Sequence, residues 1–168
     1  LYYGHALGEN TLFEGVSKVM PGEVMKIDIS SAQIIKSYFW RPEKDITLLQ
    51  DITENEAILK TRALLEQAVR RQLISDVPVG VFLSGGIDSS SITAYASKHY
   101  DKKISSFSAG FDFDNGHNEL PLAEKIAKKF NTDHHVLMIK GKNIPDIIEK
   151  MITQHDEPFS DAANIPLY

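Results

Sequence analysis

The chain has 168 residues, of which 42% are hydrophobic and 24% are charged, a composition typical of a folded globular domain and not of a disordered chain. Its formal net charge of -5 and the lack of a stripe of lysines and arginines argue against nucleic-acid binding. The sequence contains no cysteine, which excludes disulfides, thiolate metal sites and a cysteine nucleophile within it. No apolar run approaches the length of a membrane span and no signal peptide opens the sequence, so we expect a cytoplasmic protein without a membrane partner.

Residues 1–41 have a β-rich pattern. Residues 23–28 alternate between apolar and polar side chains, residues 34–40 form a second β-rich run, and a serine pair lies between the two. This arrangement predicts a β-hairpin. Because an isolated hairpin is marginally stable in water, we expect residues 1–41 to need partner strands that lie outside this chain.

Residues 42–52 are polar and begin with a proline, which predicts a linker. A helix is expected after the linker, because Thr53 and Glu56 have the spacing of a capping box, in which a hydroxyl and a carboxylate bind free main-chain N–H groups. Apolar residues then recur at helical spacing as far as Arg71. We therefore predict a second domain at residues 53–168.

From residue 79 onward, strands and helices alternate. Short apolar runs predict strands at residues 79–83, 104–109 and 134–139, and helical periodicity predicts helices at residues 88–99, 120–130 and 144–155. This alternation is typical of an α/β fold with a parallel sheet, and continuous apolar runs indicate strands that helices cover on both faces. The expected fold class is therefore α/β and Rossmann-like, with its ligand beyond the carboxyl ends of the strands.

The string SGGIDSS follows the first of these strands and leads directly into a helix. Glycines let the main chain approach a ligand, and the start of a helix carries a partial positive charge suited to phosphate. Four serine hydroxyls can donate hydrogen bonds to phosphate oxygens: Ser84, Ser89, Ser90 and Ser91. The carboxylate of Asp88 repels a bare phosphate, so its position makes sense if a Mg2+ ion lies between carboxylate and phosphates.

This string matches neither of two common phosphate loops. It lacks the lysine of G-x-x-x-x-G-K-[ST] and the spacing of G-x-G-x-x-G. A serine and two glycines alone would indicate only a tight turn with a helix cap. The complete string, directly after an apolar strand, favours phosphate binding.

The pyrophosphate-binding loop of the N-type ATP pyrophosphatases, S-G-G-x-D-S, is similar to the segment VGVFLSGGIDSS. Glutamine-dependent asparagine synthetases resemble the chain in two longer segments, LLEQAVRRQLISDVPVGVFLSGGIDSS and HDEPFSDAANIPLY. The end of their N-terminal glutaminase domain is similar to TLFEGVSKVMPGE. The resemblance extends over nearly the whole chain. It implies an adenine nucleotide alpha hydrolase-like fold in the first half of a synthetase domain, preceded by the hairpin tail of an Ntn-type glutaminase (class II amidotransferase) domain.

The same resemblance implies which residues bind ATP. They are Leu83, Ser84, Gly85, Gly86, Asp88, Ser89, Ser90 and Ala109, with Asp88 also facing Mg2+. Leu83 and Ala109 match positions that contact the base or ribose, although both could be sheet core, and the family usually has a larger aliphatic residue in place of Ala109. The resemblance assigns no catalytic residue.

The activity implied by the resemblance is that of an ATP-dependent, amide-forming synthetase. The parent enzyme would adenylate a carboxylate, typically aspartate, and release pyrophosphate; ammonia from glutamine would then attack the acyl carbon, giving asparagine, AMP and glutamate. The implied cofactors and partners are ATP, Mg2+, aspartate or a similar carboxylate, ammonia, and a second copy of the enzyme in a homodimer. The family's glutaminase cysteine and second ATP-contacting segment are missing from the sequence, so we expect an internal fragment that is inactive alone.

Two alternatives to this activity stay open. A related amidotransferase would act on another carboxylate, for example in surface-polysaccharide or antibiotic synthesis. A nucleotide-binding module would bind ATP without turnover. The regions missing from this sequence would separate the three, because an enzyme needs the second ATP-contacting segment.

Two further clusters are weak candidates for metal sites. His134 and His135 are adjacent in a strand and point to opposite faces, so they cannot easily share one ion. Asp112 and Asp114 resemble the start of a calcium loop, but the twelfth position of that loop is alanine here and not the required glutamate. We expect this stretch to be a mobile substrate loop, with Glu119 facing the cleft and residues 156–159 near it.

Overall fold

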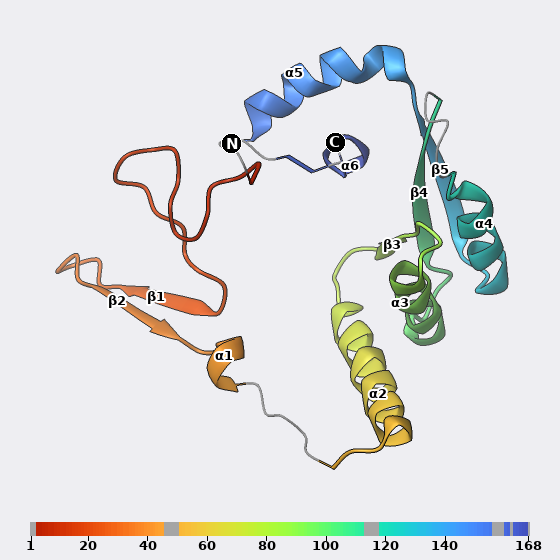
Figure 1. Cartoon of the computed structure of the whole chain (residues 1–168), viewed down its shortest axis with the longest axis horizontal. Helices are drawn as coiled ribbons and strands as arrows, with labels where there is room; N and C mark the ends of the chain where they lie inside the picture. The colour runs from red at the N-terminus through yellow and green to blue at the C-terminus, as the bar shows by residue number, and fades with distance from the viewer. Residues whose placement is uncertain (1–2, 46–50, 113–117, 156–159, 162, 168) are drawn as a thin grey trace. The chain divides into compact units, whose positions relative to one another are not determined.

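The computed structural model describes residues 3–45, 51–112, 118–155, 160–161 and 163–167 (Figure 1). Two of the positions discussed above, Asp114 and the segment 156–159, lie outside these ranges. The chain forms two compact units, one of Leu1–Asp51 with Asp146–Tyr168 and one of Ile52–Pro145. In the described part of the chain, no helix is long and apolar enough to cross a membrane.

The unit Ile52–Pro145 contains a parallel sheet with the strand order β3-β4-β5. Its strands are β3 (Gly80–Phe82), β4 (Ser105–Phe111) and β5 (Asp133–Ile139), and the connecting helices are α3 (Ile87–His99) and α4 (Leu120–Lys129) (Figure 1). Phe107 of β4 pairs with Phe82 of β3 and with His135 of β5, which fixes the register. The predicted α/β fold, with a parallel sheet and flanking helices, is confirmed.

Within residues 52–145 the helices cover one face of the sheet. Ser106, Ser108 and Gly110 of β4 are buried, whereas Phe107 between them is 43% exposed. Leu120 of α4 packs on this buried face, because its Cδ1 would lie 2.6 Å from a Cβ at Gly110. Both connections join neighbouring parallel strands by a crossover, and the right-handed sense of such crossovers puts α3 and α4 on the same side. Helices were expected on both faces of the sheet, and within this unit they cover one face.

Helix α2 (Glu54–Gln72) begins as the capping box predicts. The Glu56 N–H donates to Thr53 Oγ1 at 3.3 Å, and the Thr53 N–H donates to Glu56 Oε2 at 2.9 Å. Further along the helix, Val69 packs with Ala96 of α3 and with Ile104 in a buried apolar cluster. This cluster holds α2 against α3 and against the start of β4.

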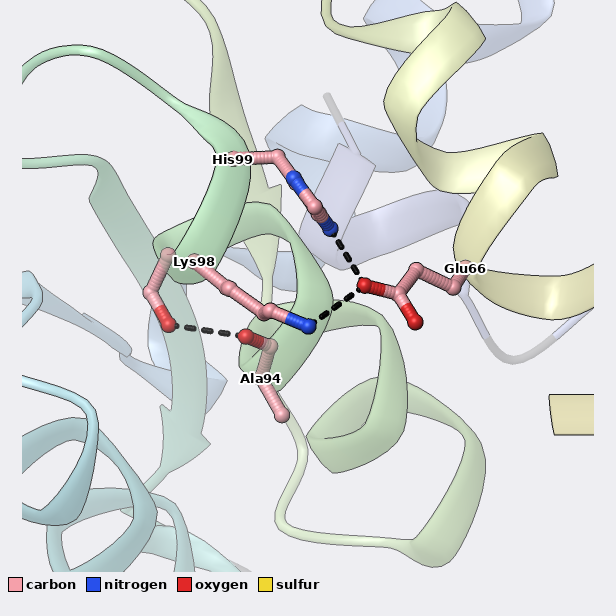
Figure 2. A network of polar contacts seen from close by, with 5 residues as sticks. Glu66, Ala94, Lys98 and His99 are labelled. Carbon is pink, nitrogen blue, oxygen red and sulfur yellow. Dashed lines mark hydrogen bonds and ion pairs between the residues drawn. The ribbon is translucent and has the colours of Figure 1, made fainter. Parts of the chain in front are cut away.

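A charged network links the same two helices. Glu66 of α2 accepts hydrogen bonds at Oε1 from Lys98 Nζ and His99 Nε2 of α3, each at 2.6 Å (Figure 2). The hydrogen bond from Lys98, followed by the one from His99, lowers the pKa of the Glu66 carboxyl below its ordinary value of 4.5. Folding therefore favours the ionised form of this carboxyl.

We expect Glu66→Gln to lower the melting temperature at neutral pH, because the substitution removes the charge that pairs with Lys98 and His99. A carboxyl whose pKa is lower in the folded state stabilises the fold above its unfolded pKa and loses this effect as the pH falls through the folded pKa. The difference between wild type and variant should therefore shrink as the pH falls below 4.5. Thermal melts at neutral and acidic pH test this, with Glu124→Gln, an exposed glutamate of α4, as the control. An equal loss at both pH values would contradict the expectation.

The unit Leu1–Asp51 with Asp146–Tyr168 contains the predicted hairpin, in which β1 (Glu23–Ile27) pairs antiparallel with β2 (Ile34–Tyr38). Asp28 shapes the turn between these strands. Its Oδ1 accepts hydrogen bonds from Ser30 Oγ at 2.6 Å, from the Ser30 N–H at 3.0 Å and from the Ser31 N–H at 2.9 Å. These bonds, the Ser30 hydroxyl first, lower the pKa of Asp28 to about 2.

The helices not yet described are α1, α5 and α6. The first residues of the predicted linker form a single helical turn, α1 (Pro42–Asp45), which a proline can begin because the first helical N–H needs no acceptor. The helix predicted at residues 144–155 is observed as α5 (Ile144–Gln154), directly after the 3-10 turn η1 (Gly141–Asn143). A further short helix, α6 (Asn164–Leu167), was not predicted.

Candidate functional site

The predicted phosphate loop lies at the carboxyl end of β3. Strand β3 ends at Phe82, α3 begins at Ile87, and residues 83–86 connect them. Gly86 is the N-cap residue of α3 and supplies no capping side chain. The loop is therefore at the edge of the sheet where ligands of parallel α/β proteins bind, directly before the start of a helix.

The two glycines of the loop have different surroundings. Gly85 has a φ of +86°, and a Cβ at this position would lie 2.9 Å from the main-chain N of Ala123 and 3.0 Å from the Cβ of Leu122. Gly86 has a φ of -65°, and the nearest atom to a Cβ there would be Ser84 Oγ at 3.4 Å. The packing of the loop on the start of α4 thus requires glycine at position 85, whereas position 86 has room for a side chain.

The side chains of Ser84 and Ser89 hold the loop together. Their Oγ atoms are 2.9 Å apart, Ser89 Oγ accepts the Ser84 N–H at 3.3 Å, and Ser84 Oγ accepts the Gly86 N–H at 3.3 Å. Ser91, the last of the four serines considered above, bonds within the helix instead, because its hydroxyl donates to the Ile87 carbonyl at 2.7 Å. The loop is thus shaped by its own hydroxyls.

Hydrogen-bond donors gather at the start of α3. The N–H groups of Ile87, Asp88 and Ser89 occupy the first turn, where a helix offers them no carbonyl acceptor. Within the described part of the chain, the buried Oγ atom of Ser90 also has no hydrogen-bond partner. The three N–H groups and the helix dipole together can stabilise an anion beside the loop, whereas Ser90 Oγ is covered by protein atoms.

Asp88 is the carboxylate nearest to these donors in sequence, and it is exposed in the first turn of α3. Mg2+ is usually held by one or two carboxylates together with substrate phosphates and water. Among the residues that the structure describes, no group of three or more His, Cys, Asp or Glu side chains could hold a metal ion. A single carboxylate beside serine hydroxyls is a donor set of the kind that would hold Mg2+ only together with phosphates.

The two residues predicted to contact the base or ribose lie in different environments. The side chain of Leu83 is 1% exposed and packs with Ala123 and Ala127 of α4. Ala109 is half-buried on β4, beside Leu137 of β5. Leu83 is buried as a whole residue and packs in the core, so its contact with the base or ribose stays a prediction.

Ser108, for which the sequence predicted no role, contacts the residue before the loop. Its buried hydroxyl donates a hydrogen bond to the Leu83 carbonyl, and the Leu83 N–H donates to the Phe107 carbonyl at 2.8 Å. A signal for Ser108 is present in the sequence. Serines occupy alternate positions, 106 and 108, in a run of residues that was predicted to be a buried strand.

The adjacent histidines of β5 have separate contacts. His134 Nδ1 lies 2.9 Å from Ser106 Oγ, whereas the ring of His135 stacks on Phe107 with the ring centroids 5.1 Å apart. They lie toward opposite faces of the sheet, as their adjacent positions predict. Glu119, which was expected to face the cleft, is the exposed N-cap residue of α4.

The fold and the loop together define a class of protein. It consists of α/β proteins in which a glycine- and serine-rich turn joins a parallel strand to a helix that lacks a side-chain cap. The model of the asparagine synthase family matches residues 60–168. The chain belongs to the asparagine synthase family, and the resemblance drawn from the sequence is confirmed.

The chain is similar to several proteins with assigned names. Putative glutamine-hydrolysing asparagine synthetase 2 of Methanocaldococcus jannaschii is 31% identical, over 94% of this chain and 30% of the relative. Glutamine-hydrolysing asparagine synthetase 3 of Bacillus subtilis is 30% identical (88% and 25%), and amidase chyE of Penicillium rubens is 28% identical (90% and 24%). Among solved structures, NH3-dependent NAD synthetase of Campylobacter jejuni is 16% identical, with a TM-score of 0.43 over 64% of this chain and 44% of that chain. The chain thus spans 24% to 30% of the length of these curated relatives.

Proposed function

We propose that the protein is an ATP-dependent, amide-forming synthetase and that the loop from Ser84 to Ser90 binds the phosphates of ATP. The observation that carries this proposal is the set of main-chain N–H donors at the start of α3, which follows a glycine-rich turn at the end of a parallel strand. Membership of the asparagine synthase family supports the same function. Residues 83 and 109 complete the proposed nucleotide site.

The proposed chemistry begins with adenylation. A carboxylate oxygen of aspartate attacks the α-phosphorus of ATP, the bond to the β-phosphate oxygen breaks, and pyrophosphate leaves with the electron pair. Mg2+, held by Asp88 and the phosphates, would neutralise part of the charge on pyrophosphate. The main-chain N–H groups of Ile87 to Ser89 would bind the departing oxygens, because donors fixed in advance stabilise developing charge most effectively.

Amide formation follows from the adenylate. Ammonia attacks the acyl carbon, AMP leaves, and the amide forms after loss of a proton. The ammonia would come from glutamine in a glutaminase domain, of which residues 1–41 would be the carboxyl-terminal tail, with residues 42–52 as the linker to the synthetase domain. We propose that the complete protein acts in the cytoplasm as a homodimer and that the present chain alone is inactive.

A second candidate function is considered because relatives with a name other than asparagine synthetase also match the chain. Amidase chyE of Penicillium rubens is 28% identical to the chain, close to the identity of the relatives named asparagine synthetases. The alternative that stays open within the asparagine synthase family is a related amidotransferase, which would form an amide on a carboxylate other than aspartate. The loop would have the same task in both cases, since both reactions would begin with adenylation.

Isotope exchange between pyrophosphate and ATP tests the proposed function. We expect the full-length protein to catalyse this exchange in the presence of Mg2+ and aspartate, because adenylation is reversible until ammonia consumes the adenylate. Exchange that needs a different carboxylate would favour the second candidate. Binding of ATP without exchange for any carboxylate would contradict both and favour a module without turnover.

A further inference from the structure

Ser108 contacts the main chain at Leu83, between the end of β3 and the loop. Its side chain is 8% exposed on the helix-covered face of β4, and its hydroxyl donates to the carbonyl of Leu83. The Leu83 N–H is held as well, by the Phe107 carbonyl at 2.8 Å. Both polar main-chain groups of the last residue before Ser84 are therefore fixed by β4.

The Ser108 hydroxyl replaces a main-chain hydrogen bond between β3 and β4. Paired residues of β3 and β4 end at Phe82 and Phe107, although β4 continues to Phe111. The next carbonyl of the β3 chain, that of Leu83, is buried and needs a donor, because a buried carbonyl without one costs free energy. A side-chain hydroxyl meets this need and leaves the chain free to turn into the loop directly afterwards.

Ser106 offers a direct comparison. It lies on the same strand and the same face, and its side chain is also buried. Its Oγ contacts Thr132 Oγ1 at 2.7 Å and His134 Nδ1 at 2.9 Å, both toward β5 and away from the loop. The two serines are similarly buried and have the same side chain, but Ser108 bonds to the residue before the loop and Ser106 bonds to side chains at β5.

We propose that Ser108 is a positioning residue for nucleotide binding, which acts by fixing the Leu83 carbonyl so that the loop starts at the correct point and in the correct direction. This inference rests on the proposed function of the loop. Gly85 is seated against the start of α4, and Ser108 fixes the residue before Ser84 against β4. The donors of the loop are thus held from both sides, and loss of either contact lets them drift from the phosphates.

The test compares Ser108→Ala with Ser106→Ala in the full-length protein. Calorimetric titration with Mg-ATP should show about ten-fold weaker binding for Ser108→Ala, the effect of about one lost hydrogen bond, and unchanged binding for Ser106→Ala. Urea unfolding should show that both substitutions lower stability, because each leaves buried polar groups without a partner. Ser108→Cys keeps the volume and a weak donor, so its affinity should lie between those of wild type and Ser108→Ala.

The outcomes separate the two proposals. Wild-type protein that does not bind Mg-ATP overturns the proposed function, and the role of Ser108 with it. Wild-type binding that is unchanged in Ser108→Ala, or reduced equally in Ser106→Ala, overturns only the role of Ser108. If Ser108→Ala does not fold, Ser108→Cys decides, and wild-type affinity in that variant would contradict the inference.

Discussion

Gly85→Ala is expected to destabilise the protein by about 2 to 5 kcal/mol, whereas Gly86→Ala should leave its stability nearly unchanged. An alanine at position 85 would have to adopt a φ near +86°, which costs a residue with a Cβ about 1 to 2 kcal/mol. The Cβ would also lie 2.9 Å from the main-chain N of Ala123, so the start of α4 would have to shift. Overpacking of this kind typically costs about 1 to 3 kcal/mol more.

Gly86 lacks both penalties. Its φ of -65° suits alanine, and the nearest atom to a new Cβ is Ser84 Oγ at 3.4 Å. Alanine is a poorer N-cap than glycine, but it also restricts the unfolded chain, and these two effects, each of about 0.5 to 1 kcal/mol, oppose each other. Urea unfolding of both variants is the measurement. Equal losses of stability, or a larger loss in Gly86→Ala, would contradict the assigned roles of the two glycines.

The same pair of variants also tests the loop as a phosphate site. If the main chain at Gly86 approaches the phosphates, Gly86→Ala should weaken Mg-ATP binding although the protein stays folded. A Cβ at this position would only touch Ser84 Oγ, at 3.4 Å, so a large loss of affinity in this variant would come from a clash with the ligand. Unchanged affinity in a stable Gly86→Ala protein would place the phosphates elsewhere.

Features that depend on neighbouring residues could be predicted from the sequence. The capping box at Thr53 and Glu56, the order of strands and helices, and the position of the loop are examples, because propensity, spacing and turn chemistry act over a few residues. The helix bounds agree to within one residue for α3, α4 and α5. Local chemistry was sufficient for these elements.

Features that depend on distant contacts could not be predicted in this way. The difference between Gly85 and Gly86 arises from α4, which packs on one glycine and not on the other. The task of Ser108 depends on the register of β3 against β4, and the place of Leu83 in the core depends on Ala123 and Ala127. Each requires knowledge of which segments meet, and a strand pattern does not contain it.

Asp88→Asn is expected to weaken binding of Mg-ATP about ten- to a hundred-fold and to remove most of its dependence on Mg2+. Asp88 is exposed in the first turn of α3, beside N–H groups that favour an anion. Its negative charge opposes bare polyphosphate and becomes favourable only when a cation lies between the two. Loss of one charged partner typically costs about 1.5 to 3 kcal/mol, which corresponds to that range of affinity.

The sign of the effect should reverse when the metal is removed. In EDTA, wild-type protein has an unscreened carboxylate next to the phosphates, so Asp88→Asn should bind ATP at least as tightly as wild type does. Calorimetric titration of the full-length protein, with Mg2+ and with EDTA, measures both arms. Asp101→Asn is the matched control, because it changes the net charge equally at an exposed position beyond the far end of α3. If Asp88→Asn binds Mg-ATP as tightly as wild type and adenylates its substrate normally, Asp88 does not hold the metal, and the charge at the start of α3 serves only to stabilise the helix.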